Sequence, residues 1–171
     1  MKVIFLDIDG VLNSIDSMVA YHYLKIPQRS RELDLISIGL LKALCDKTEA
    51  KICISSTWRI GRTVQDFIDI FQSYGWEDSP IIGMTPIMRS HGIYRGHEIQ
   101  HWLDEHPEVE NYVILDDDSD MLEPQFGNFV SISSVNGFRS KHYCKCLRLF
   151  GYPNEGLENQ VNFVRKSDIS V

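Results

Sequence analysis

The sequence predicts an α/β fold, a Rossmann-like parallel sheet with helices on both faces. Short apolar segments with strand composition alternate along the chain with segments whose apolar residues recur every three or four positions, the spacing of an amphipathic helix. This alternation is typical of βαβ units, whose right-handed crossovers build a parallel sheet covered on both faces. The 171 residues, 43% of them apolar, show no internal repeat and no linker, so we expect residues 1–171 to form a single domain.

The expected elements follow one another with recognisable start and stop signals. Thr63 and Asp66 have the spacing of a capping box, and a later helix stops before Pro107. Two stretches, 13–34 and 79–94, lack a regular pattern and are interpreted as loops, the first of them lying over the ligand crevice. In chain order we expect strand 2–7, helix 37–48, strand 51–55, helix 63–75, helix 96–105, strand 112–115, strand 128–132 and helix 141–150.

Composition excludes several classes of protein. The formal net charge of -7 argues against an extended basic surface and so against bulk nucleic-acid binding. No stretch approaches the roughly 18 apolar residues of a membrane span, and Asp7 interrupts the first apolar run before it could act as a signal sequence. We therefore expect a cytoplasmic protein without membrane contact. Its four cysteines lack the spacing of a disulfide framework and are expected to stay reduced.

Polar side chains follow three of the expected strands at the point where each strand ends. Asp7 and Asp9 follow the first strand, Ser55 the second, and Asp116 and Asp117 the strand 112–115. The carboxyl ends of parallel strands meet at one edge of a sheet, where open α/β proteins bind their ligands. Carboxylates at the end of a buried strand need a compensating partner, and Mg²⁺ prefers such hard oxygen ligands together with phosphate oxygens. The pattern therefore predicts a magnesium site and a phosphate substrate.

The order of these motifs resembles the haloacid dehalogenase (HAD) superfamily of aspartate-nucleophile phosphohydrolases. Asp7-Ile8-Asp9-Gly10-Val11-Leu12 is similar to the first motif of that superfamily, Ser55 to the second, and Ile114-Leu115-Asp116-Asp117 to the fourth. A narrower resemblance, to small HAD domains of RNA repair proteins and phage polynucleotide 3′-phosphatases, rests on Ser55-Ser56-Thr57-Trp58-Arg59, Arg95-Gly96-His97-Glu98-Ile99 and Trp102-Leu103. The intervals between motifs are too short for a large lid, so we expect little or no cap.

The resemblance implies a role for each motif residue. Asp7 is expected to be the nucleophile that forms an aspartyl-phosphate, and Asp9 the general acid and base. Ser55 is expected to donate a hydrogen bond to the phosphoryl group. The implied Mg²⁺ ligands are Asp7, Asp9 through its backbone carbonyl, Asp116 and Asp117.

The basic residue of the third motif is expected to be Arg95, with Arg89 as the alternative. Arg59 is a candidate second phosphate clamp, and Trp58 a candidate for stacking on a base. Together with Ser56 and Thr57, these two residues form the expected substrate-binding segment.

The expected function is a Mg²⁺-dependent phosphomonoesterase acting on a nucleic-acid or nucleotide phosphate end. Two alternatives are a small-molecule phosphatase acting on mononucleotides and a HAD-like binding protein without catalysis. A zinc-protease motif, His97-Glu98-Ile99-Gln100-His101, competes with this interpretation, but Pro107 ends the helix early and no third zinc ligand has the required spacing. Asp118, with Ser119, is a candidate cap for the following helix, whereas Asp120 is a candidate for contact with metal-bound water.

Overall fold

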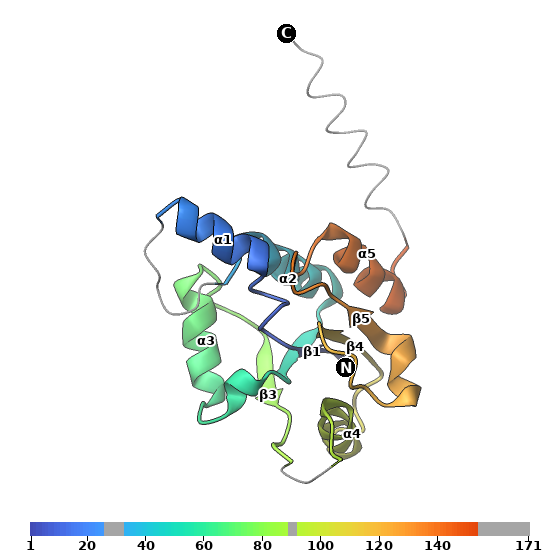
Figure 1. Ribbon diagram of the computed structural model, residues 1–171. Coiled ribbons are helices and arrows are strands. Elements are labelled where there is room, and N and C mark those ends of the chain that lie inside the picture. Colours follow the sequence, from blue (N-terminus) through green and yellow to red (C-terminus); the bar gives the residue numbers. More distant parts are fainter. Residues whose placement is uncertain (26–32, 89–91, 154–171) are drawn as a thin grey trace.

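The computed structural model describes residues 1–25, 33–88 and 92–153 and contains a five-stranded parallel sheet (Figure 1). The strands are arranged in the order β3-β2-β1-β4-β5, so the first strand of the chain lies at the centre of the sheet. Their bounds are β1 Lys2–Leu6, β2 Lys51–Ile54, β3 Ile81–Met84, β4 Asn111–Asp116 and β5 Phe129–Ser131.

Helices cover both faces of this sheet, as the sequence predicts (Figure 1). On one face, Ile4 and Leu6 of β1 pack in the apolar cluster that contains residues of α2, α3 and α5. On the other face, Val3 and Phe5 pack with residues of α4. Alternate residues of a buried parallel strand face opposite layers, which explains why the strand is apolar throughout. The helices are α1 Ile15–Tyr23, α2 Leu35–Thr48, α3 Val64–Ser73, α4 Arg95–Glu105 and α5 Ser140–Leu149, with short 3₁₀ turns η1 Thr57–Arg59 and η2 Glu123–Asn128.

Helix α1 lies in the segment 13–34, which was interpreted as a loop, and that part of the prediction is wrong. Ser14 caps the helix by accepting a hydrogen bond from the Ser17 backbone. The apolar side chains of α1 face outward, with Met18 59% and Tyr23 78% exposed. Ile15, Met18, Val19 and Tyr23 do have helical spacing, which the sequence analysis missed within this longer irregular stretch. In the structure these side chains form an exposed stripe rather than a buried one.

The second predicted loop, 79–94, is also wrong in part, because it contains strand β3. Its four residues, Ile81–Met84, form the edge of the sheet beside β2. The pairing includes a register shift between Ile52 and Cys53. A short edge strand that contains a glycine has weak strand composition, so the pairing depends on the neighbouring strand rather than on local preference.

Two further observations concern the described cysteines and helices. Cys45, Cys53, Cys144 and Cys146 are all buried free thiols. Within the described part of the chain, no helix combines the length and apolar character needed to cross a membrane.

Candidate active site

The loop after β1 turns sharply at Gly10. The backbone N–H groups of Val11 and Leu12 donate to the carbonyl of Ile8, which closes the turn. Gly10 has a φ of +75°, and a Cβ added there would lie 2.3 Å from Oδ2 of Asp117. A side chain at this position would therefore be strained by the backbone and would also collide with a carboxylate of the site.

Arg95 connects the strand ends at the centre of the site. Its Nη1 lies 3.1 Å from Oδ1 of Asp7, and its Nε lies 2.9 Å from Oδ2 of Asp116. Nη1 also donates to the backbone carbonyl of Ser55. Because Arg95 is the first residue of α4, its backbone N–H lacks a partner within the helix and donates to the Asp120 carboxylate at 3.2 Å. One guanidinium thus joins the ends of β1, β2 and β4.

Three carboxylates form an acidic cluster beside this guanidinium. Ligand oxygens of Asp7, Asp116 and Asp117 all lie within 4.8 Å of one another. Burial raises the pKa of Asp116 to about 8, with Arg95 opposing the shift and the neighbouring Asp7 adding to it. Burial also raises the pKa of Asp7 and of Asp117, again with a contribution from neighbouring acids.

The acidic cluster fits a divalent cation. Its donors are the hard carboxylate oxygens that Mg²⁺ prefers, and they come from a site where the protein alone disfavours three negative charges. A bound cation would remove this penalty by favouring the ionised carboxylates. Asp7, Asp116 and Asp117 are therefore the side chains that would hold Mg²⁺ here.

Asp9 lies outside the acidic cluster and is held by two donors. Nδ2 of Asn13 donates to Oδ1 of Asp9 at 2.9 Å, and the indole Nε1 of Trp58 donates to Oδ2 at 2.8 Å. The Asp9 side chain is exposed, whereas Asn13 and Trp58 are buried. The backbone N–H of Gly10 donates to Oδ1 of Asn13 at 2.9 Å, which fixes the amide.

The segment after β2 places two serines at the site. Ser55 is fully buried, and its hydroxyl has no hydrogen-bond partner among the described residues. Ser56 is also buried, and a hydrogen bond from its side chain acts to lower the pKa of Asp7. Thr57 is exposed at the start of η1. A buried hydroxyl without a partner is costly, so Ser55 is a donor available for a ligand.

Arg59 has a different environment from that expected of a phosphate clamp. Its guanidinium carries five N–H donors, and five protein acceptors surround it, of which one is the carboxylate of Glu98. The other four are the backbone carbonyls of Ser55, Ser56, Thr85 and Pro86. With 5% of its surface exposed, Arg59 has no donor left for a phosphate, and the contacts favour a structural role.

Trp58 is similarly enclosed. Only 7% of its surface is exposed, its N–H is bound to Asp9, and the guanidinium of Arg62 lies 5.3 Å from its ring centroid. This placement favours a contact with the acid over stacking on a base.

The sequence patterns did not indicate three functional contacts of the site. Asn13 binds Asp9 within the loop after β1, Glu98 of α4 binds Arg59 of η1, and Asp120 binds the start of α4. Glu98 is also the glutamate of the competing zinc-protease motif, and its pairing with Arg59 removes it from such a role. Arg89, the alternative to Arg95, lies outside the described residues.

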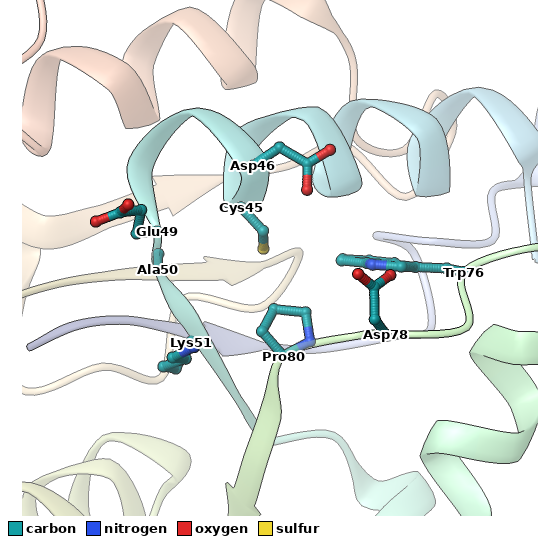
Figure 2. Close-up of a pocket in the computed structure, with 8 residues that line it drawn as sticks. All are labelled: Cys45, Asp46, Glu49, Ala50, Lys51, Trp76, Asp78 and Pro80. Atoms are coloured by element: carbon teal, nitrogen blue, oxygen red, sulfur yellow. The ribbon is translucent and has the colours of Figure 1, made fainter.

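A separate hollow lies at the opposite edge of the sheet, where β2 begins. It has a volume of about 440 Å³ and is lined by residues of the end of α2, the start of β2 and the segment before β3 (Figure 2). Burial raises the pKa of its only cysteine, Cys45, to about 12, so the thiol is neutral at ordinary pH. None of the motif residues lines this hollow.

The parallel sheet and the acidic strand ends define a domain of the HAD superfamily of hydrolases, to which phosphatases belong. The family model for the HAD domain in Swiss Army Knife RNA repair proteins matches residues 3–143, and the chain belongs to this family. The match confirms the resemblance inferred from the sequence motifs. No curated protein and no solved structure matches the chain.

Proposed function

We propose that this chain is a Mg²⁺-dependent phosphomonoesterase that acts on the phosphate end of a nucleotide or nucleic acid. The observation that carries the proposal is the position of Arg95, whose guanidinium lies 3.1 Å from Asp7 and 2.9 Å from Asp116. A candidate nucleophile, a fixed cation and a candidate metal ligand thereby meet at one edge of the sheet. Phosphoryl transfer depends mainly on such positioning and on neutralisation of charge.

Several residues of the site contribute to the first step, the formation of an aspartyl-phosphate. An oxygen of Asp7 attacks phosphorus in line and forms an aspartyl-phosphate, while Arg95 neutralises charge on the phosphoryl oxygens. The free hydroxyl of Ser55 donates a hydrogen bond to the same group. When Mg²⁺ is bound by Asp7, Asp116, Asp117 and the backbone carbonyl of Asp9, it supplies further neutralisation of the phosphoryl oxygens.

Asp9 completes the cycle by moving protons. Its carboxyl group gives a proton to the leaving oxygen as the bond from phosphorus to that oxygen breaks. It then takes a proton from the water that attacks the aspartyl-phosphate. The bond from phosphorus to the Asp7 oxygen breaks, which restores the Asp7 carboxylate and releases inorganic phosphate. The exposure of Asp9 leaves its carboxyl group accessible to both the leaving group and water.

The substrate class is proposed from two observations. The family is described by its occurrence in RNA repair proteins, which favours a phosphorylated nucleic-acid end. The net charge of -7 argues against a polynucleotide substrate, because a polynucleotide is itself strongly negative. A phosphatase for free mononucleotides is therefore the second candidate.

A panel of substrates tests both parts of the proposal. Turnover with Mg²⁺ is measured on a 3′-phosphorylated oligonucleotide, a 5′-phosphorylated oligonucleotide, mononucleotides and a generic aryl phosphate. We expect release of phosphate from an oligonucleotide end to be fastest, with no turnover by Asp7→Asn. A preference for mononucleotides would select the second candidate, and undiminished activity of Asp7→Asn would overturn the nucleophile assignment.

A further inference from the structure

We infer that Trp58 and Asn13 are positioning residues that hold the Asp9 carboxyl group in its reactive orientation. This inference rests on the proposed function, in which Asp9 transfers the protons. The two side chains approach Asp9 from different segments and donate one hydrogen bond to each of its oxygens, at 2.8 Å from Trp58 and 2.9 Å from Asn13.

The two donors, Trp58 and Asn13, are fixed by their own contacts, whereas the acceptor, Asp9, is exposed to solvent. Trp58 packs in the apolar cluster on the α2 face of the sheet, and its own backbone N–H donates to Oγ of Ser56. Asn13 is held by the backbone N–H of Gly10. Asp9 is exposed, so without these donors its side chain would be free to change rotamer. Two buried donors therefore restrict an exposed acid.

The hydrogen bonds leave Asp9 able to transfer a proton. Each carboxylate oxygen has two lone pairs, so each keeps one after accepting a bond from Trp58 or Asn13. The proton given to the leaving oxygen, and later taken from water, occupies one of these remaining positions. The leaving oxygen gains this proton as it loses its bond to phosphorus, and Asp7 regains its carboxylate when water displaces it.

The geometry also explains why a tryptophan stands in this segment. The indole N–H can donate a hydrogen bond but cannot accept one, so it binds Asp9 only as a donor to a carboxylate oxygen. Arg62 covers the ring, at 5.3 Å from its centroid, and restricts its motion. A misplacement of about 1 Å in a catalytic group can lower a rate by about 100-fold, so a fixed acid gives a large advantage.

The first test uses Trp58→Phe, which keeps an aromatic ring and removes the N–H. The matched control is Trp102→Phe, because Trp102 is also buried, at 5% exposure, but packs on the α4 face of the sheet. We expect Trp58→Phe to lower kcat on an alkyl phosphate, whose leaving oxygen needs the proton, by about 10- to 100-fold with little change in KM. Formation of the aspartyl-phosphate from an aryl phosphate, which has a good leaving group, should be nearly unchanged, and this intermediate should accumulate. Asn13→Ala should show the same pattern.

Equal slowing of aspartyl-phosphate formation from the two phosphates, a change in KM alone, or the same behaviour in Trp102→Phe would overturn the positioning role. Failure of the unmodified protein to turn over any phosphate would instead overturn the proposed function, on which this role rests. Normal turnover by the unmodified protein, combined with an unaffected Trp58→Phe, would overturn the positioning role alone.

A second readout does not depend on activity. The indole N–H resonance of Trp58 can be assigned by its loss from the NMR spectrum of Trp58→Phe. In Asp9→Ala this resonance should shift, because its acceptor is gone, while the indole resonances of Trp76 and Trp102 stay in place. An unchanged Trp58 resonance in Asp9→Ala would contradict the hydrogen bond itself.

Discussion

Replacing Glu98 by glutamine should destabilise the protein strongly, because it removes the only carboxylate that pairs with the buried guanidinium of Arg59 among the described residues. The side chains of Arg59 and Glu98 are 5% and 12% exposed. Removing one partner of a buried pair costs about 3–5 kcal/mol. Glutamine keeps the shape and one acceptor, so we expect a loss near the lower end, about 3 kcal/mol. For a domain of this size that corresponds to a fall of about 6–12 °C in the melting temperature.

The surface pair of Lys42 and Asp46 provides a matched control, since Asp46→Asn makes the same change from carboxylate to amide. The side chains of that pair are 40% and 60% exposed, and an exposed pair of this kind contributes about 0.5 kcal/mol or less. Urea unfolding followed by circular dichroism measures both variants. If Glu98→Gln lost no more free energy of unfolding than Asp46→Asn, the structural role assigned to Arg59 would be refuted.

Three further predictions concern the site itself. Ser55→Ala should leave the free energy of unfolding unchanged or slightly higher, because its hydroxyl is buried without a partner, while turnover falls about 100-fold; a clear loss of stability in a melt would contradict this. Gly10→Ala should weaken Mg²⁺ binding, measured by calorimetry, because its Cβ would displace Asp117; unchanged affinity would argue against that carboxylate as a ligand. The pKa of Asp116 rises from 3.8 unfolded to about 8 folded, so the folded state binds more protons between these values. The stability of the metal-free protein should therefore fall as pH rises from about 4 to about 8, and Mg²⁺ should reduce the fall. A melting temperature that does not change across this pH range would contradict the assignment.

The positions of the acids followed from local patterns in the sequence. Asp7 and Asp116 each stand at the end of an apolar run, and the rules for parallel sheets place such ends together. The inference about the acids succeeded because strand composition and crossover direction act over short stretches of chain. Arg95 was expected from the resemblance to the third HAD motif, and it does begin the helix that brings it to Asp7.

The roles of Arg59 and Trp58 could not be predicted in the same way. Both were expected at the substrate, since a basic and an aromatic residue beside a phosphate site are typical ligands. The structure gives Arg59 five protein acceptors and gives Trp58 the carboxylate of Asp9, which lies 49 positions earlier in the chain. A polar side chain that becomes buried must bind whichever acceptors the fold brings near it.

The sequence by itself determined the parallel sheet apart from its edge strand β3, the helices apart from α1, and the meeting of acids at one edge. These features depend on hydrophobic period and on the handedness of crossovers. Only the tertiary structure decided which polar residues face the ligand and which support the site. Burial makes that choice, together with the distant partners of Arg59 and Trp58 and the lack of a partner for the Ser55 hydroxyl among the described residues. The hydrogen bonds of a buried group depend on packing between segments that are remote in the chain.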